Sequence, residues 1–130
     1  MDLHEARDFF SNDIYATEQT KIEILEVGEN FSKCRICISH EHMNADNKVM
    51  GGVYYTLADF CFAIATDAKT TKTVTTSSTI TYLSACKGKE LIAECKKIKE
   101  GRTLCTYETV IYDDLGTKVA LIISNGMHTA

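Results

Sequence analysis

The sequence predicts an α+β domain in which an antiparallel β-sheet wraps around one long central helix. Residues 53 to about 67 carry a helical pattern, and strand-like stretches surround it in the order α-β-β-α-β-β-β-β. This order contains too few helices between consecutive strands for a doubly wound parallel sheet. The 130 residues have the size of one domain, and we expect residues 1–130 to form a single one.

The N-terminal part of the chain predicts a short helix followed by a hairpin. Residues 2–12 place leucine, alanine and phenylalanine side chains on one helical face. Residues 21–27 and 31–39 are strand-like, and residues 28–30 between them form a turn signal. Residues 40–48 are polar and predict a loop that leads to the main helix.

The main helix, over residues 53–67, is expected to be buried. Its apolar residues recur at helical spacing, at Val53, Leu57, Phe60 and Ile64. Its other faces are apolar too, and such a helix packs inside a protein rather than on its surface. Four stretches rich in threonine, valine, isoleucine and tyrosine follow and predict strands, at residues 73–83, 90–99, 103–112 and 118–128.

Composition and charge exclude several classes of protein. The chain is 45% hydrophobic and 25% charged, as is ordinary for a soluble globular domain. Its net charge of -4 argues against nucleic-acid or membrane-surface binding. No apolar run approaches the ~20 residues that span a bilayer. The N-terminus has no basic region followed by an apolar stretch, so we expect a cytoplasmic protein.

The six cysteines are expected to be free thiols in a reducing compartment. Cys34 and Cys37 are three residues apart in a predicted strand, so their side chains should point to opposite faces. No second Cys-x-x-Cys pair completes a zinc site, and no histidine spacing is typical of a metal site or a triad. We therefore expect neither a metal nor a cofactor.

Asp59 is the first candidate catalytic residue because it lies among apolar residues of the predicted buried helix. A carboxylate is costly in such surroundings unless it is paired, faces a cavity or takes part in chemistry. Held there, it can activate water. An ordinary solvent-facing helix Asp is the alternative, and the apolar character of the whole helix weakens that alternative.

Gly51 and Gly52 stand where the main helix should begin. Free N–H groups at a helix start lie at the positive end of the helix dipole and can bind a carbonyl oxygen. Glycines let a ligand approach the bare backbone, so the Gly51 N–H is a candidate oxyanion donor. The simpler interpretation is that the pair only turns the chain, and a Gly-Gly pair alone is a weak signal.

The distance between Gly51 and Asp59 along the helix limits how the two residues can act on one substrate. Asp59 is eight residues past Gly51, or roughly 12 Å along a helix axis. One Asp side chain does not easily bridge that distance, so a site that uses both residues should lie between two subunits. Asn44 is a further candidate donor, although a loop Asn more often stabilises a turn. Thr75 is one hydroxyl in a threonine-rich strand and carries no weight alone.

Basic residues cluster in a chain that is acidic overall, at Lys87, Lys89, Lys96, Lys97, Lys99 and Arg102. An anionic ligand would need such a patch. Lysine is also common at solvated strand edges, where it prevents aggregation, and composition alone favours that interpretation.

At this point the sequence resembles the hotdog-fold acyl-CoA thioesterases, specifically the PaaI-type (phenylacetic acid) group. The similarity spans nearly the whole chain and is strongest from His42 to Asp59, which includes the Met50-Gly51-Gly52 segment. Further similar segments follow in order, at residues 8–13, 26–29, 80–88, 99–102 and 113–116.

The resemblance implies a hotdog fold and self-association as dimers, usually paired into tetramers. It implies that Asp59 is the general base or nucleophile and that the Gly51 amide and Asn44 polarise the thioester carbonyl. Thr75 falls where a hydroxyl helps to place water or substrate, and Met50 and Gly52 are among the expected substrate- or CoA-binding residues. Contacts to CoA are implied for Tyr82, Ser84, Lys87, Lys99, Gly101, Arg102 and Thr103. Since CoA carries phosphates, the basic cluster gains a function.

The chain departs from the family pattern at two positions. Met50 stands where the family usually has the His of a His-Gly-Gly segment, and Ala85 stands where it usually has Pro. The Gly51 amide is unaffected by the first change, but the lost imidazole could alter substrate placement or rate.

The expected function is hydrolysis of acyl-CoA thioesters, with aryl or phenylacetyl groups among the candidate acyl groups. The alternative is a non-catalytic acyl-CoA-binding or sensing dimer, which Met50 suggests. A hotdog dehydratase is disfavoured, because those enzymes resemble a different pattern with a catalytic His near prolines, and this chain has no Pro. The acyl group, the tetramer arrangement and the pathway remain open.

Overall fold

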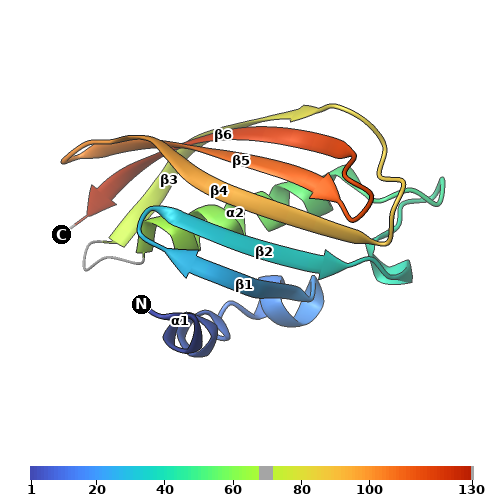
Figure 1. Cartoon of the computed structure of the whole chain (residues 1–130), viewed down its shortest axis with the longest axis horizontal. Helices are drawn as coiled ribbons and strands as arrows, with labels where there is room; N and C mark the ends of the chain where they lie inside the picture. Colours follow the sequence, from blue (N-terminus) through green and yellow to red (C-terminus); the bar gives the residue numbers. More distant parts are fainter. Residues whose placement is uncertain (68–71, 130) are drawn as a thin grey trace.

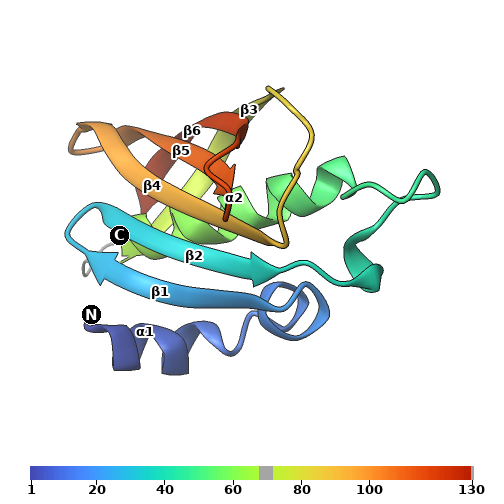
Figure 2. The ribbon, with the colours of Figure 1, turned by 45° about the vertical axis from the view of Figure 1, so that its right-hand side comes forward.

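The computed structural model describes residues 1–67 and 72–129 and confirms the hotdog arrangement of an antiparallel sheet around a central helix (Figure 1). The main helices and the strands are α1 Leu3–Phe10, β1 Ile22–Gly28, β2 Phe31–Cys37, α2 Gly51–Asp67, β3 Lys72–Tyr82, β4 Glu90–Glu100, β5 Leu104–Asp113 and β6 Lys118–Thr129. These strands form one sheet in the order β1-β2-β4-β5-β6-β3, with antiparallel neighbours throughout. Figure 2 shows the sheet curving around α2.

α2 is buried over most of its surface because its side chains are largely apolar. Leu57 and Cys61 have no exposed area, and Ile64 is 1% exposed. The sheet supplies their apolar surroundings, including the fully buried Ile36 of β2 and Leu91 of β4. Burying one such large aliphatic side chain stabilises the fold by roughly 1.5–3 kcal/mol. The prediction of a buried helix is therefore confirmed for most of α2 but not for the face that carries Gly52, Tyr55 and Asp59, and the helix begins two residues earlier than Val53.

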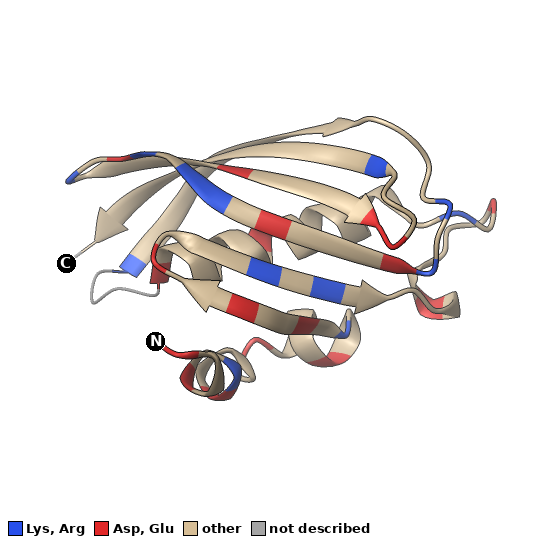
Figure 3. Ribbon diagram, viewed as in Figure 1, with Lys and Arg blue, Asp and Glu red and all other residues tan. Residues whose placement is uncertain are grey.

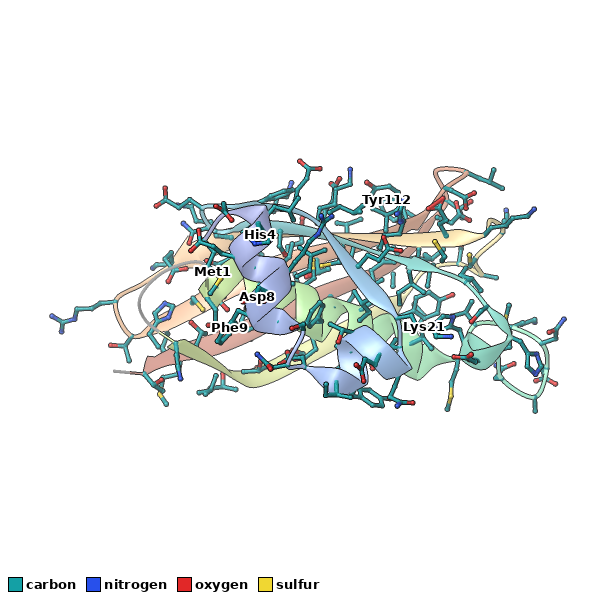
Figure 4. All side chains as sticks on the ribbon, turned by 90° about the horizontal axis from the view of Figure 1, so that it is seen from below. Met1, His4, Asp8, Phe9, Lys21 and Tyr112 are labelled. Atoms are coloured by element: carbon teal, nitrogen blue, oxygen red, sulfur yellow. The ribbon has the colours of Figure 1, made fainter. Side chains whose placement is uncertain are left out.

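α1 covers the β1 edge of the sheet. The Arg7 guanidinium donates two hydrogen bonds, of 3.0 and 2.8 Å, to the Ile24 carbonyl of β1. Phe10 is buried and packs edge-on against Phe60 of α2, whereas Phe9, labelled in Figure 4, is half exposed. A single π-helical turn follows α1, and the sequence does not predict it because the turn has no apolar periodicity.

The opposite edge of the sheet is β3, which pairs only with β6 among the described strands. A β-bulge lies between Thr75 and Ser77 and shifts the alternation of side chains by one residue. As a result, Thr75 interacts with Asp59 while Tyr82 contacts Gly51, so both side chains face α2. In a regular strand, residues seven apart would face opposite sides. Because of the bulge, β3 contributes one side chain near Asp59 and another near Gly51.

The outer face of the β1–β2–β4 half of the sheet carries rows of alternating charge (Figure 3). Lys33 lies 3.5 Å from Glu26 and 3.6 Å from Glu94, and Arg35 lies 2.9 Å from Glu23. Exposed pairs of this kind contribute little stability, so their main effect is to keep this face soluble.

The six cysteines are free thiols, as predicted. Cys34 is buried and Cys37 is exposed, which confirms that they point to opposite faces of β2. Three more are buried and act as small apolar side chains, namely Cys61, Cys95 and Cys105. Across residues 1–67 and 72–129, the structure has no helix both long enough and apolar enough to cross a membrane.

Candidate active site

The start of α2 presents backbone donors. Gly51 is the first helical residue, and the Val53 N–H closes the first turn on the Met50 carbonyl at 2.9 Å. The N–H groups of Gly51 and Gly52 have no acceptor among the described residues, as expected in the first turn of a helix. They lie at the positive end of the helix dipole, so this position favours a partly negative oxygen.

Tyr82 of β3 packs directly against this turn. Its hydroxyl donates a hydrogen bond of 3.1 Å to the Gly51 carbonyl, and its ring meets the Tyr54 ring edge-on. A Cβ on Gly51 would lie only 3.0 Å from the Tyr82 oxygen, so glycine is what allows this approach. A Cβ on Gly52 would meet nothing within 4 Å. Of the two glycines, therefore, only Gly51 is one where an added Cβ would force a neighbouring side chain to shift within the protomer.

A hollow of about 550 Å³, here called the helix-start hollow, opens beside this turn. It brings together four predicted site residues: Asn44, Gly51, Tyr82 and Ser84. The Asn44 Oδ1 accepts hydrogen bonds from the Asp46 and Lys48 amides at 2.9 and 3.1 Å, which is the turn-stabilising role. This arrangement leaves the Asn44 Nδ2 group as the free end of the side chain, so it can donate to a ligand oxygen.

Asp113 fixes the loop that forms one wall of the helix-start hollow. Its Oδ2 accepts from the Lys87 and Gly88 amides, at 2.8 and 3.0 Å. Its Oδ1 accepts from the Leu115 and Thr117 amides, at 3.0 and 2.8 Å. Burial raises the pKa of Asp113, but these four hydrogen bonds outweigh it and lower the pKa to about 2. An ionised, buried carboxylate therefore ties the β3–β4 loop to the β5–β6 turn.

Asp59 lies in a second hollow, of about 290 Å³, here called the Asp59 hollow. The side chain is exposed in the protomer, which corrects the expectation that the apolar character of the helix would keep it from facing solvent, and Ile14 and Phe60 line the hollow beside it. Burial is the main cause that raises the pKa of Asp59, and the charge of Asp13 raises it further. A hydrogen bond with the Thr75 side chain partly offsets both. The carboxylate is thus a better proton acceptor than an ordinary Asp.

The two hollows are separate within one protomer. Gly51 lines the first, Asp59 lines the second, and their linings share no residue. Both residues belong to the continuous helix Gly51–Asp67, so the rise between them is roughly 12 Å. The geometry agrees with the spacing argument that one protomer does not bring these groups to the same carbonyl.

The other predicted substrate-binding residues fall into two groups. Met50 is 57% exposed beside the helix-start hollow, and Lys87 lies between two residues that line it, Cys86 and Gly88. The second group lies in the β4–β5 hairpin and comprises Lys99, Gly101, Arg102 and Thr103. β4 has 11 residues, so this hairpin is roughly 30 Å from the first group. One protomer does not bring the two groups together.

The basic cluster is only partly explained as a strand edge. β4 lies between β2 and β5 and is therefore an interior strand of the sheet. Its pairing with β2 stops at Lys96, and the following basic residues extend beyond β2. The exposed end of β4 is thus a local edge that also reaches into solvent, where it can meet an anion.

His42 has a structural role. It is 3% exposed, its Nε2–H donates to the Thr20 carbonyl at 2.7 Å, and its Nδ1 accepts from the Ser39 amide at 3.0 Å. These two partners define the neutral Nε2–H tautomer. The imidazole ties the loop before α2 to the segment before β1.

Asp13 and Asp113 shape the two hollows, and the sequence alone does not single them out. Asp13 belongs to the 8–13 segment that resembles the family, but its proximity to Asp59 depends on how the N-terminal segment packs on α2. Asp113 belongs to the 113–116 segment that resembles the family, but the sequence alone gives it no role. An Asp-Asp-x-Gly turn after a strand was the available signal, because Asp side chains cap nearby amides.

A family model described as the thioesterase superfamily matches residues 47–120, which run from the loop before α2 to the start of β6. A candidate esterase of Archaeoglobus fulgidus is 28% identical over 120 residues, which cover 92% of this chain and 78% of that protein. Both matches include Gly51, Asp59 and Tyr82 within a single aligned stretch of more than half of the chain.

Several solved structures share the fold. A thioesterase of Haemophilus influenzae superposes with a TM-score of 0.89 at 18% identity, covering 99% of this chain and 91% of that one. The Escherichia coli PaaI protein from the phenylacetic acid degradation operon gives 0.85 at 20% identity, covering 98% and 96%. A hypothetical thioesterase of Streptococcus pneumoniae, solved with coenzyme A, gives 0.84 at 24% identity, covering 95% and 96%.

Proposed function

The chain belongs to the thioesterase superfamily, and we propose that it hydrolyses acyl-CoA thioesters with Asp59 as its catalytic carboxylate. The main support for this proposal is that two groups suited to thioester hydrolysis lie on one helix. α2 offers free amides at its start and, two turns later, a carboxylate whose pKa is raised. Thioester hydrolysis needs donors for the developing oxyanion and a group that activates water or attacks directly.

The chemistry follows from these roles. The thioester carbonyl oxygen accepts from the Gly51 N–H and the Asn44 Nδ2 group, which stabilise the negative charge of the tetrahedral intermediate. Asp59 removes a proton from water as the water attacks, or attacks the carbonyl carbon itself to give an anhydride that water then opens. Collapse of the intermediate breaks the C–S bond and releases CoA as a thiolate. Thr75, whose side chain lies close enough to Asp59 to lower its pKa, helps to orient the carboxylate or the water.

The proposed active unit contains at least two protomers. Gly51 and Asp59 occupy separate hollows, so a complete site requires Gly51 of one protomer and Asp59 of its partner. β3 provides an edge with which a second copy can associate, since only one of its sides is paired among the described strands. We infer a dimer or a tetramer on this basis.

CoA is the proposed leaving group. A Streptococcus pneumoniae protein of this fold was solved with coenzyme A, and the basic residues of this chain offer phosphate contacts. Lys87 stands beside the helix-start hollow, and Lys99 and Arg102 stand on the β4–β5 hairpin. In an assembly, the hairpin of one protomer can approach the hollow of another, which would place both groups on one CoA.

The direct test is thiol release from a panel of aryl-acetyl and aliphatic acyl-CoAs, with wild type and Asp59→Asn side by side. We expect rapid release by the wild type alone, with the preferred acyl group identified by the panel. Wild-type turnover by Asp59→Asn would overturn the assignment of Asp59.

The shared site is tested by mixing two inactive variants, Asp59→Asn and Gly51→Pro. If the protomers exchange freely, half of the dimers carry one of each, and one of their two sites has both intact residues. About a quarter of the wild-type rate should therefore return. A site built within one protomer would give no recovery. Gel filtration with light scattering on the same samples verifies that mixed oligomers form.

A second candidate function is acyl-CoA binding without turnover, and Met50 favours it. Met50 is exposed beside the donors of the helix-start hollow, and a thioether neither donates a proton nor orients a carbonyl. Tight binding of acyl-CoA without thiol release, together with gain of turnover in Met50→His, would support this function over hydrolysis.

A further inference from the structure

Three strand ends bring Glu100, Cys105 and His128 together on the helix-facing side of the sheet. Glu100 ends β4, Cys105 lies near the start of β5, and His128 lies near the end of β6. Cys105 pairs with Glu100 on one side and with Gly126 on the other. The Glu100 carboxylate, the Cys105 sulfur and a His128 ring nitrogen all lie within 4.8 Å of one another. Residues far apart in the chain thus converge on one point.

The cluster is sheltered but reachable. Cys105 is 3% exposed, whereas the side chains of His128 and Glu100 are 10% and 17% exposed. A small ion can enter from the Glu100 side, whereas a substrate cannot reach the Cys105 sulfur. This burial excludes a cysteine nucleophile of the Cys-His type, which must touch its substrate. With a nucleophilic role for Cys105 excluded, the arrangement of the three side chains favours the binding of an ion.

Neighbouring groups orient the two outer members of the cluster. The Thr73 hydroxyl and the His128 Nδ1 are 2.8 Å apart, which directs the His128 Nε2 towards Glu100 Oε1, with which it is in contact. The Tyr107 hydroxyl donates to Glu100 Oε2 at 2.5 Å, so Oε1 is the oxygen that faces His128 and the one that would bind an ion between the two residues. Histidines and carboxylates that bind metals are oriented in this way, by a hydrogen bond to the atom that does not bind.

Glycine at position 126 preserves the space beside the sulfur. A Cβ there would lie 3.2 Å from the Cys105 sulfur and 3.0 Å from the Phe62 ring. It would also lie 2.6 Å from the Thr73 methyl group, which belongs to the residue that orients His128. A larger side chain would therefore displace the parts of the cluster from one another.

We propose that Glu100, Cys105 and His128 bind one Zn²⁺ ion, with a water molecule as the fourth ligand. Thiolate, imidazole and carboxylate are the three ligand types that zinc accepts, and three protein ligands with one open position form a common set. Tetrahedral zinc holds such ligand atoms roughly 3–4 Å apart. All three ligand atoms lie within 4.8 Å of one another, and the directly contacting His128 Nε2 and Glu100 Oε1 would separate to admit the ion. Binding displaces the thiol proton, which passes to solvent, and no oxidation or reduction is involved.

This site is distinct from the proposed catalytic one and does not depend on it. The cluster lies where β4 and β6 end and β5 begins, whereas Gly51 lies at the other end of the sheet. Because the ion would tie three strand ends together, it would stabilise the folded chain in proportion to the logarithm of its free concentration. It would also fix the base of the β4–β5 hairpin, whose tip carries Arg102.

The test measures binding of Zn²⁺ alone to the chelator-treated full chain, by calorimetry and by thermal unfolding. We expect one ion per protomer and a higher melting temperature with Zn²⁺ than with chelator. Cys105→Ser and His128→Gln should each weaken Zn²⁺ binding by more than ~10-fold. Loss of a residue that only hydrogen-bonds a metal ligand already costs about that much, and loss of a ligand itself should cost more. Matched controls are Cys95→Ser, a buried thiol elsewhere on β4, and His40→Gln, an exposed imidazole.

A spectroscopic measurement keeps the proposal testable if the Cys105 variant does not fold. Co²⁺ bound to wild type should show the charge-transfer absorption of a cobalt–thiolate bond and the visible bands of a tetrahedral site. Zn²⁺ should abolish both by competition. Binding that disappears in His40→Gln but persists in His128→Gln would overturn the proposal. A Co²⁺ complex without the thiolate band, or no stoichiometric binding by wild type, would overturn it equally.

Discussion

The helix-start hollow and the Asp59 hollow differ in what supplies their chemistry. In the first, the donors are mainly backbone amides, held by the start of α2 and by the Asp113-anchored loop. In the second, one side chain acts, and its surroundings set its pKa. A site made of backbone tolerates side-chain replacement, which explains how Met50 can stand beside Gly51 without removing an amide. A site made of one carboxylate does not.

The largest expected effect is therefore at Asp59. Asp59→Asn keeps the size of the side chain but removes the proton acceptor or nucleophile, so kcat should fall by about 10²–10⁴. The matched control is Asp67→Asn at the other end of the same helix, which should keep its turnover because Asn can still accept from the Thr73 amide. Steady-state thiol release measures both, and circular dichroism verifies that α2 is intact.

The second-largest effect on kcat is expected at Gly51, where a proline substitution removes the backbone N–H. Gly51→Pro and Gly51→Ala both add a Cβ against Tyr82, but only proline removes the N–H. Proline is tolerated in the first turn of a helix. The ratio of kcat for the Ala and Pro variants should be about 10²–10³, the usual cost of losing one oxyanion donor. Equal rates for the two variants would show that the Gly51 amide takes no part.

A smaller effect is expected on the anchor of the first hollow. Asp113→Asn places an NH₂ group where Oδ2 accepts the Lys87 and Gly88 amides, so the β3–β4 loop should loosen. The KM for acyl-CoA should rise several-fold, while kcat at saturation changes less. Because Asp59 lies in the other hollow, the pH dependence of kcat should stay unchanged.

The same residue makes a prediction about acid stability. The pKa of Asp113 is about 2 in the folded chain, below its ordinary value of 3.8. The ionised group therefore stabilises the fold above pH 3.8, and this contribution disappears as the pH falls towards 2. Thermal unfolding between these pH values should show a steeper loss of stability for wild type than for Asp113→Asn. Parallel curves would contradict the assignment.

The smallest expected effects are shifts in the pKa of Asp59, seen in the pH dependence of kcat/KM. Asp13→Asn removes a charge that raises the pKa of Asp59, so the acid limb of kcat/KM should move to lower pH. Thr75→Val removes a hydrogen bond that lowers the pKa, so the limb should move to higher pH. Shifts of opposite sign in the two pH–rate profiles are the expected result. Movement in the same direction would show that the limb does not report Asp59.

The fold was predictable because its signals are local. The apolar spacing of α2 and the β-prone composition of the strands depend on neighbours in sequence, and both predict the elements that the structure shows. The strand order was not readable from the chain, because β2 pairs with β4 and β3 pairs with β6 across long sequence separations. The bulge beside Thr75 was equally hidden, since it depends on the register with β6.

The candidate site was predictable where function depends on backbone or on one exceptional residue. Gly51 at a helix start and Asp59 among apolar neighbours both violate a local rule, and such violations are visible in sequence. Asp13 was missed because its effect on Asp59 arises from packing of the N-terminal segment. Glu100, Cys105 and His128 were missed because their proximity depends on the register of three strands.

The contact between Gly51 and Tyr82 has a consequence for how sequences of this kind can drift. A methyl group at position 51 would meet the Tyr82 ring within 3.0–3.3 Å, and that ring is backed by Tyr54. A lineage that acquires alanine at position 51 must therefore shorten or move the side chain at position 82. A lineage that shortens position 82 first is then free to lose the glycine. Positions 51 and 82 should therefore covary among related sequences, although one lies on a helix and the other on a strand.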